Sequence, residues 1–420
     1  DGVAGNALFR VALGDREATA RGMAAAAVVV HDHTVHQRIV NCQMEPRSAI
    51  GEFDAASARY TLTTGSQGVS RLQTVLAAAL RVTMDEVRVV TPDVGGGFGP
   101  RSFLYVEQLL VAWAARRVGR PVKWTSDRSE AFLSDYGGRD AESTAALALD
   151  RDGRILAYDL EVLGNAGAHA VAYVSLSNIR NVVNTVYDVP AVHLRLAALL
   201  THTVPTAPFR GAGRPEAMHV METLLDRGAR ALGLDRVEIR RRNLIRRDQM
   251  PYRNPMGVPY DSADFRGYME RVLVAADWVG FAARRTAAKA RGRIAGIGVA
   301  NYVETPVGAP RERAEVTLAA DGSVDVVVGT HTTGQGHETS FAQVLADQLG
   351  VAIEAIHLRY GDTSFVKAGG GTHSDRSMRL AGTLLVQAAG EIVEKGKAIA
   401  ARKLEVAAAD LVFDAGVYRI

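Results

Sequence analysis

Three glycine-rich turns constrain this chain more than any other feature, because each follows a β-like stretch and leads towards a helix-like one. They are GGGFG at 95–99, FRGAGR at 209–214 and TGQGHE at 333–338. Glycine lets backbone N–H groups approach a ligand closely, and helix N-termini favour anionic groups such as phosphate. A single turn of this kind is more often a plain turn or bulge. Three of them together indicate a ligand that carries phosphate.

Strand and helix patterns alternate along the chain and predict a mixed α/β (α+β) fold. β-branched or alternating runs are typical of strands, and apolar residues at helical spacing are typical of helices. The predicted strands lie at 87–92, at 292–304, in a pair within 142–167 and in a pair within 315–330, and the predicted helices lie at 104–119, 214–234 and 337–350. Hairpins mixed with helices argue against a purely parallel sheet.

The length of 420 residues allows two or more domains, each with its own core. The polar, proline-containing segment 246–265 is the best candidate for a boundary. We therefore predict a linker at 1–19, a first domain at 20–265, connecting helices at 266–289 and a second domain at 290–420.

Composition argues against several functions. The 49 basic and 46 acidic residues nearly cancel, so we expect no nucleic-acid binding, and RRRNLIRR at 240–247 fits a solvated helix face or a subunit contact. We find no apolar run of the roughly 18–20 residues that a membrane span needs. Cys42 is the one cysteine, so we expect no disulfide within the chain and no protein-ligated Fe–S cluster or zinc–thiolate site. A cytoplasmic location fits, and a periplasmic one stays open because the chain starts at DGVAGN rather than at Met.

Familiar nucleotide motifs do not account for the glycine-rich turns. The sequence contains no Walker pattern that ends in GK[ST]. GGGFGP lacks the last glycine of a dinucleotide fingerprint. Neither ATP nor NAD is therefore the expected ligand.

Five longer segments identify a better candidate, because they occur together and in order. They are QMEPRSAIGEFD (43–54), TPDVGGGFGPRSF (91–103), APFRGAGRPEAMHVMETLLDRGARALGLD (207–235), GTHTTGQGHETSFAQVLADQLGV (329–351) and RYGDTSFVKAGGGTHSDRSMRLAG (359–382). Over nearly the whole chain they closely resemble the molybdenum-cofactor-binding large subunit of the xanthine dehydrogenase/aldehyde oxidase family. The resemblance implies two molybdopterin-binding modules.

The resemblance also implies roles for residues of the GGGFG loop, the FRGAGR loop and a further turn at 63–73. In the family the GGGFG loop lies against molybdopterin and its Phe flanks the channel near molybdenum. A Gln in the strand-to-helix turn TTGSQGVSRLQ hydrogen-bonds a molybdenum ligand, and an Arg lies in the substrate-side loop. The residues to which these roles carry over are Gln67, Gly95, Gly96, Gly97, Phe98, Gly99, Phe209, Arg210 and Gly211. Of these, Arg210 and Gln67 are the candidates for catalysis. From the residues alone, Arg210 could equally tie its loop to backbone carbonyls.

Two further loops resemble family loops that grip the pterin or its phosphate. The resemblance assigns Gly334, Gln335 and Gly336 to the first of them, and Arg376 and Ser377 to the second. The second loop departs from the usual form at 373–375.

The substrate-side loop narrows the expected chemistry. Carbon monoxide dehydrogenases carry a Cys in the corresponding loop, whereas this chain has Gly211, Ala212 and Gly213. We therefore expect no aerobic CO oxidation. Xanthine oxidoreductases carry a bulky aromatic residue where this chain has Ala212, which argues against a purine sandwich.

Histidines at 31, 33 and 36 raise the question of a metal site, because His31 and His33 would share one face of a strand. No Asp, Glu or Cys partner can be named, and we expect no metal there. Glu45 could pass for a catalytic base, but we interpret Glu45 and Arg47 as structural.

The resemblance implies hydroxylation of an aldehyde or an N-heteroaromatic substrate, with water as the oxygen source. The implied cofactor is Mo-molybdopterin, in mononucleotide or cytosine dinucleotide form, and its dithiolene holds the metal, so no residue of this chain binds molybdenum directly. Electrons would leave through a 2Fe-2S subunit to an FAD subunit. The family's general-base Glu lies beyond the last motif found here, so we name none. We expect the chain to be the central part of a longer subunit, inactive by itself.

Two alternatives stay open at this stage. The chain could be a non-catalytic cofactor scaffold or a split subunit that needs a partner chain. It could also belong to a nucleotide-dependent oxidoreductase of another family, which would bind a nucleotide without molybdenum.

Overall fold

The computed structural model describes residues 3–305 and 308–420 and groups them into two compact units. The first unit combines the chain up to Val40 with Tyr136–Thr305, and the second combines Asn41–Asp135 with the described residues after 307. Segment 41–135 thus belongs with residues far along the chain. The sequence suggested a division in linear order, because local periodicity does not reveal which distant segment a module packs against.

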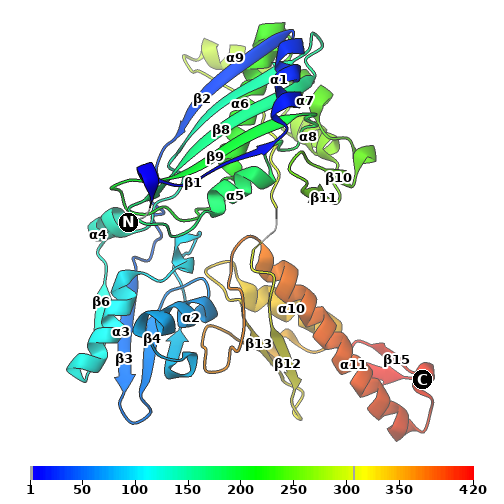
Figure 1. The fold of residues 1–420 in the computed structure, drawn as a ribbon. Helices are drawn as coiled ribbons and strands as arrows, with labels where there is room; N and C mark the ends of the chain where they lie inside the picture. Colours follow the sequence, from blue (N-terminus) through cyan, green and yellow to red (C-terminus); the bar gives the residue numbers. More distant parts are fainter. Residues whose placement is uncertain (1–2, 306–307) are drawn as a thin grey trace. The chain divides into compact units, whose positions relative to one another are not determined.

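A five-stranded sheet organises the first unit, with the strand order β1-β9-β8-β7-β2 (Figure 1). β8 and β9 run parallel, and the other neighbours run antiparallel. The strands are β1 (Ala7–Gly14), β2 (Val28–His36), β7 (Ala141–Leu149), β8 (Ile155–Gly167) and β9 (Val192–Leu200). The strand pair predicted within 142–167 is confirmed as β7 and β8.

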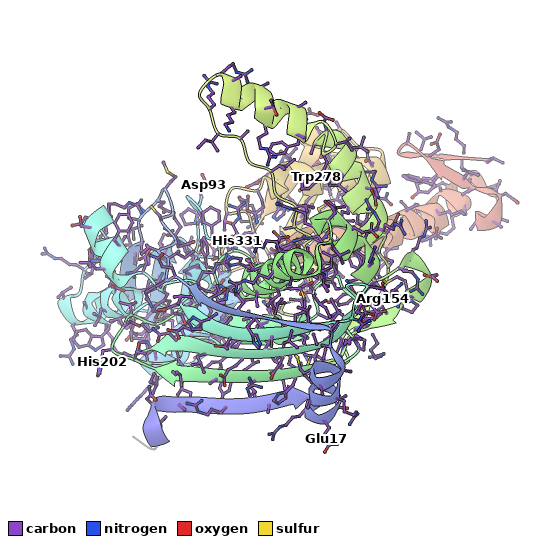
Figure 2. The ribbon with its side chains drawn as sticks, turned by 90° about the horizontal axis from the view of Figure 1, so that it is seen from above. Glu17, Asp93, Arg154, His202, Trp278 and His331 are labelled. Carbon is purple, nitrogen blue, oxygen red and sulfur yellow. The ribbon has the colours of Figure 1, made fainter. Side chains whose placement is uncertain are left out.

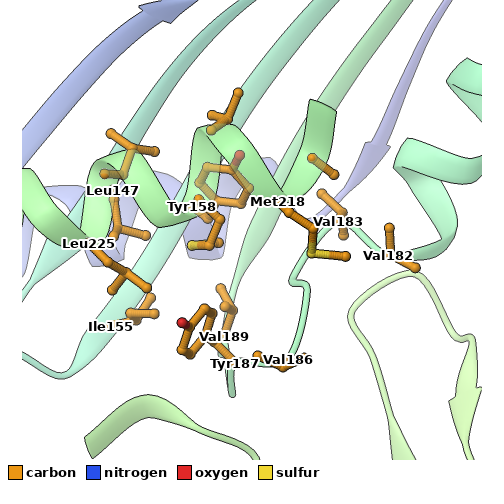
Figure 3. Packing of buried hydrophobic residues seen from close by; sticks show 14 of the residues in the cluster. Leu147, Ile155, Tyr158, Val182, Val183, Val186, Tyr187, Val189, Met218 and Leu225 are labelled. Atoms are coloured by element: carbon orange, nitrogen blue, oxygen red, sulfur yellow. The ribbon is translucent and has the colours of Figure 1, made fainter. Parts of the chain in front are cut away.

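Helix α6 (Arg214–Leu232) covers one face of this sheet and forms the main core with it. Met218 and Leu225 are two helical turns apart, and both belong to the buried cluster that includes Tyr158 and Leu147 of the sheet (Figure 3). This apolar stripe recurs with the period of a helix, as the sequence predicted. The helix ends at Gly233, whose φ of +65° suits a glycine C-cap.

The remaining elements of the first unit lie around the sheet. α1 packs Ala18 and Met23 against Ala148 and Ala157, on the sheet face opposite α6. These elements are α1 (Arg16–Ala25), α5 (Val174–Asn181), α7 (Arg236–Asn243), β10 (Tyr252–Arg253), β11 (Pro259–Tyr260), α8 (Phe265–Ala275) and α9 (Phe281–Ala290). The helices expected at 266–289 correspond to α8 and α9.

The strand predicted at 292–304 is wrong, because these residues form no strand in the described structure. The alternation in GRIAGIGVANYVE resembles a strand, but the segment pairs with no strand, and only some of its apolar residues, such as Val299 and Val303, pack against the core. Ile294 is fully exposed to solvent. Asn301 is anchored by its side chain, which donates to the Tyr187 hydroxyl at 3.0 Å. Periodicity alone does not supply a partner strand.

The second unit contains two sheets, each covered by helices. The first sheet has the order β5-β4-β3-β6 and packs against α2 and α3. Its elements are β3 (Ser48–Asp54), β4 (Arg59–Thr64), α2 (Val69–Leu80), β5 (Val87–Val90), α3 (Val106–Val118), β6 (Val122–Thr125) and α4 (Arg128–Ser134). The predictions of a strand at 87–92 and a helix at 104–119 are confirmed.

The second sheet has the order β12-β13-β14 and packs against α10 and α11. The elements of this part are β12 (Ala314–Leu318), β13 (Val324–Val328), α10 (His337–Leu349), β14 (Ile356–Arg359), α11 (Thr383–Leu404), β15 (Val412–Asp414) and β16 (Val417–Arg419). The hairpin predicted within 315–330 and the helix predicted at 337–350 are confirmed. In the described part of the chain we find no helix that has both the length and the apolar character to cross a membrane.

The two sheets of the second unit are joined through β5. Arg88 forms an ion pair of 2.5 Å with Asp362, and the Thr91 N–H donates to the Gly361 carbonyl at 2.7 Å. The Val89 N–H donates to the Thr363 hydroxyl at 3.0 Å. These contacts explain why residues 41–135 form one compact unit with the C-terminal part of the chain.

Candidate functional site

The GGGFG loop follows β5 and adopts a conformation that demands glycine. Gly96 and Gly99 have φ values of +101° and +125°, and Phe98 has +55°. Residues other than glycine rarely adopt positive φ values of this size. Phe98 nevertheless does so, and its side chain is 45% exposed. The loop therefore presents an aromatic ring on its surface.

The other glycines of this loop are required by close packing within the protein. A Cβ on Gly95 would lie 2.4 Å from the Cβ of Glu45, and a Cβ on Gly97 would lie 2.5 Å from the Cγ of Gln67. The Gly95 N–H donates to the Glu45 carboxylate at 2.8 Å. That carboxylate also accepts from Arg101 at 2.7 Å. Glu45 thus holds the loop in place.

Arg47 has a comparable structural role nearby. Its guanidinium is buried and forms ion pairs of 2.5 Å with Asp135 and 2.7 Å with Glu107. These contacts agree with the structural interpretation of the segment 45–47 made from the sequence.

Gln67 links the GGGFG loop to a loop more than 300 residues away in sequence. Its amide oxygen accepts from the Gly99 N–H at 2.8 Å, and its amide nitrogen donates to the Thr372 carbonyl at 2.8 Å. The Thr372 N–H returns a hydrogen bond to the Gln67 carbonyl at 2.7 Å. The side chain is 5% exposed. Gln67 is therefore fixed by both loops.

The loop before α10 contains glycines with open space around them. Gly334 and Gly336 have φ values of +116° and +73°. A Cβ added to either would meet no heavy atom of the described chain within 4 Å. The Gln335 amide nitrogen donates to the Thr372 hydroxyl at 2.6 Å. This loop and the GGGFG loop are thus tied to the same residue, Thr372.

Arg376 and Ser377 lie where the loop at 369–377 enters a helix. Arg376 is fully buried and forms an ion pair of 2.5 Å with Glu312, which is buried as well. The guanidinium also donates to the carbonyls of Ala309, Gly371 and Arg311, at 3.0, 2.6 and 2.8 Å. Arg376 therefore fixes the backbone of this loop from its buried side.

The Ser377 hydroxyl lies 2.6 Å from the Thr330 hydroxyl and donates to the Thr372 hydroxyl at 3.0 Å. Thr372 therefore receives the side chains of both Gln335 and Ser377. Direct contacts of Arg376 and Ser377 with a cofactor stay a prediction.

Three helix N-termini converge on this loop network. α2 begins after Gly68, α10 begins after Gly336, and the helical segment Ser377–Gly382 leads into α11. Gly68 and Gly336 contribute no side chain that could cap the first N–H groups. Unpaired N–H groups at helix N-termini favour an anion. The arrangement fits the phosphate of a pterin cofactor, and the open space at Gly334 and Gly336 fits a bulky ligand.

Two buried histidines flank the start of α10. His331, which is labelled in Figure 2, is 1% exposed, and its Nε2 donates to the Ser66 carbonyl at 2.7 Å. His337 stacks on the ring of Phe341. Burial lowers the pKa of both imidazoles below the ordinary value. Both are therefore neutral at pH 7, and they add no positive charge to the field of the helix ends.

The loop at 209–214 lies in the first unit and is described by itself. Gly213 has a φ of +92°, and a Cβ there would lie 1.9 Å from the Ser175 carbonyl oxygen. Arg139 donates to the Arg210 carbonyl at 2.7 Å and pairs with Glu216 at 3.0 Å. Arg139 thus positions the backbone of Arg210, whose residue is exposed.

The two arginines of this loop, Arg210 and Arg214, differ in their surroundings. Arg214 is buried and forms an ion pair of 2.7 Å with Glu304. Its guanidinium also donates to the Thr305 carbonyl at 2.7 Å. Phe209 lies beside Arg139, whose guanidinium is 5.2 Å from the ring centre. Arg214 is therefore structural, whereas the substrate-facing role of Arg210 stays a prediction.

The predicted residues fall into two groups. Gln67, the GGGFG loop and the residues at 334–336 and 376–377 gather in the second unit, around Thr372. Phe209, Arg210 and Gly211 lie in the first unit. Sequence reasoning missed Thr372 and Arg139. Thr372 lies inside the quoted GGGTHSDRS run, but its hydroxyl partners are distant in sequence, and YGGRD around Arg139 carries no recognisable signal.

The histidines of β2 do not form a metal cluster with other residues. His31 and His33 are exposed and share one strand face, as expected, whereas His36 is buried and lies 2.9 Å from the Ser143 hydroxyl. Within 3–305 and 308–420, no group of three or more His, Cys, Asp or Glu side chains could hold a metal ion.

Sequence comparison assigns both parts of the chain to one kind of domain. The profile of the molybdopterin cofactor-binding domain matches residues 2–244, and a second molybdopterin cofactor-binding domain profile matches residues 271–420. The boundaries predicted at 265 and 290 stay a prediction.

Individual relatives extend over almost the whole chain. The carbon monoxide dehydrogenase large chain of Hydrogenophaga pseudoflava is 31% identical, over 99% of this chain and 54% of that chain. The 6-hydroxypseudooxynicotine dehydrogenase complex subunit gamma of Paenarthrobacter nicotinovorans is 33% identical, over 95% of this chain and 51% of its own length. The chain thus spans about half the length of the curated relatives it matches.

A solved structure is similar over the full length of the chain. Quinoline 2-oxidoreductase from Pseudomonas putida 86 superimposes with a TM-score of 0.93 and 31% identity, over 100% of this chain and 55% of that chain.

Proposed function

Because the chain belongs to the family of molybdopterin cofactor-binding domains, we propose that it is the cofactor-binding portion of a molybdenum hydroxylase. The substrate class is an aldehyde or an N-heteroaromatic compound, and water is the source of oxygen. The observation that carries the proposal is the convergence of three helix N-termini on the loop network around Thr372. Relatives named for quinoline and 6-hydroxypseudooxynicotine support the heteroaromatic option.

The residues of the second unit bind and orient the cofactor in this proposal. Backbone N–H groups at the starts of α2 and α10 bind its phosphate, and the open space beside Gly334 and Gly336 receives the pterin. The GGGFG loop lies against the cofactor, with Phe98 exposed on its surface. Gln67 is clamped in one orientation between Gly99 and Thr372, and its remaining amide N–H would donate to a ligand of the metal.

The bound cofactor supplies the oxygen transfer and accepts two electrons, and the protein supplies binding and positioning. Arg210 orients the substrate carbonyl or ring through its planar donors, and Arg139 fixes the backbone on which Arg210 stands. Electrons pass to 2Fe-2S and FAD groups on partner subunits. We place the enzyme in the cytoplasm.

We do not expect CO as the substrate, although a relative is named carbon monoxide dehydrogenase. The positions at which the resemblance would require a thiol are Gly211, Ala212 and Gly213. Cys42, the one cysteine of the chain, is exposed and belongs to the other unit. CO oxidation by this loop would therefore lack its sulfur ligand.

Elemental analysis of the intact complex from the native host tests the proposal. We expect about one molybdenum per subunit, together with iron and flavin on separate chains. Acid release of the cofactor, followed by mass spectrometry, distinguishes the mononucleotide from the cytosine dinucleotide form. An intact complex without molybdenum contradicts the cofactor assignment. Molybdenum without turnover of any aldehyde or N-heteroaromatic compound contradicts the substrate class.

A further inference from the structure

An open groove on the second unit lies outside the loop network and has no assigned role. It is formed where α2 ends and where the second half of α3 passes β4, and its volume is about 640 Å³. α2 and α3 lie on the same four-stranded sheet (Figure 1). The side chains that matter to its chemistry are Leu80, Arg81, Leu110, Trp113, Arg116 and Arg117.

The apolar side chains of the groove are exposed to an extent that calls for an explanation. Leu110 is 50% exposed and Trp113 is 46% exposed, although both stand on a helix whose other face packs into the core. Contiguous apolar surface with a polar rim is typical of sites at which proteins bind one another. Tryptophan and arginine are also enriched among the residues that contribute most to protein interfaces.

The side chains that line the groove carry a net positive charge. Arg81, Arg116 and Arg117 are exposed, and among the residues that the structure describes none of the three has a carboxylate within 4.0 Å. The lining itself contains no Asp or Glu. The nearby Glu86 carboxylate accepts hydrogen bonds of 2.8 and 2.7 Å from the N–H and hydroxyl of Thr83, and it attracts Arg116 without forming an ion pair with it.

Arg116 and Arg117 lie in the last turn of α3, where the partial negative charge of the helix C-terminus favours basic residues and accounts for their presence. It does not explain the exposed indole beside them. The Arg117 guanidinium lies 4.5 Å from the centre of the Trp113 ring, and Arg116 donates to the Tyr60 hydroxyl at 3.0 Å. These contacts hold the cations in place before any partner arrives.

We propose that this groove docks an acidic segment of a partner polypeptide that carries a large apolar side chain. The apolar side chain packs on Leu110 and Trp113, and flanking Asp or Glu residues pair with Arg81 and Arg117. The openness of the groove favours an extended segment over a small enclosed ligand, because a small molecule would leave most of its surface in water. The proposal does not depend on the cofactor or on the substrate.

The test measures binding of fluorescent acidic peptides to the full-length subunit by anisotropy. The probe peptide has a central Leu-Phe pair flanked by glutamates, and two matched peptides replace either the pair by Ser or the glutamates by Gln. We expect the probe to bind at least tenfold more tightly than either matched peptide, and more weakly as salt rises.

Matched variants of the subunit locate the binding. Arg81→Gln with Arg117→Gln, and separately Trp113→Ser, should each weaken the probe at least tenfold. Arg120→Gln with Lys123→Gln removes the same charge from exposed positions outside the groove and should leave binding within about twofold. All four altered cations and Trp113 are exposed, so folding should be preserved.

Four outcomes overturn the proposal. Equal binding of the Ser-containing peptide shows simple ion pairing, as does displacement of the probe by inorganic phosphate at matched ionic strength. Equal effects of the groove variants and the control variant place the peptide elsewhere. Self-association of the subunit that the groove variants abolish identifies a second copy of the chain as the occupant.

Discussion

The loops at 95–99 and 333–336 lie in the same unit and are both rich in glycine, but their glycines have different surroundings. Side chains at Gly95 and Gly97 would collide with Glu45 and Gln67, whereas side chains at Gly334 and Gly336 would enter open space. The first loop uses its glycines to pack against the protein. The second combines left-handed backbone with free volume. A glycine-rich motif is therefore evidence for a ligand only where the protein itself leaves room.

Removal of the ion pair that supports the loop at 369–377 should lower the stability of the protein most, because that loop is bonded to both glycine-rich loops. Glu312→Gln leaves the buried Arg376 without its counter-ion, and we expect the free energy of unfolding to fall by about 3–5 kcal/mol. Urea denaturation measures it. Glu315→Gln breaks the exposed pair with Arg313 and should cost at most about 1 kcal/mol. If both variants lost a similar amount of unfolding free energy, the buried ion pair of Arg376 would not be what stabilises these loops.

Overpacking of the first loop should come next. Gly97→Ala places a methyl group against the Gln67 side chain, and we expect a loss of about 1–3 kcal/mol with displacement of the Gln67 amide. Denaturation together with the molybdenum content of the purified subunit measures both consequences. Unchanged stability and metal content would show that the loop relaxes without cost.

Acid should weaken the second loop before the first. Burial lowers the pKa of His331 and His337 in the folded protein, so the unfolded chain binds more protons below its ordinary pKa of about 6.5. Stability is therefore fully present above that pH. It is lost as pH falls towards the folded pKa values, by up to about 1.4 kcal/mol per pH unit for each histidine. Hydrogen exchange of residues 329–340 between pH 7 and pH 5 follows the effect, with residues 95–99 as the internal reference.

The smallest change in stability should come from Gly336→Ala. Its φ of +73° costs alanine about 1 kcal/mol, and no protein atom obstructs the new methyl group. If the open space receives the cofactor, metal content should fall more than stability does. Retention of full molybdenum content would show that the ligand lies away from Gly336 and would weaken the distinction between the two loops.

The elements that the sequence predicted well are those with a local cause. α6 carries an apolar stripe, Pro215 in its first turn and Gly233 at its end, all within one stretch of chain. The strand expected at 292–304 also had the right alternation, but alternation does not supply the neighbouring strand that a sheet requires.

The site was predictable only in its motifs and not in its connections. The hydrogen bond between Gln67 and Thr372 joins residues 305 positions apart, and no local pattern announces it. The contact of Arg376 with the cofactor stays a prediction, and the sequence did not indicate that carbonyls and Glu312 also engage its guanidinium. Side-chain availability depends on three-dimensional neighbours, which periodicity and motif spacing leave undetermined.

The interleaved order of the two units has a consequence for synthesis on the ribosome. Residues 41–135 emerge early, but Gln67 and Arg88 find Thr372 and Asp362 only after the first unit has been translated. At roughly 5–20 residues per second, that delay lasts about 10–50 s. During this interval the apolar face of the sheet lacks its partners, because the contacts that complete this unit join residues far apart in sequence. The loop network around Thr372 can therefore form only after residues 41–135 have remained for that time without the residues that complete their unit.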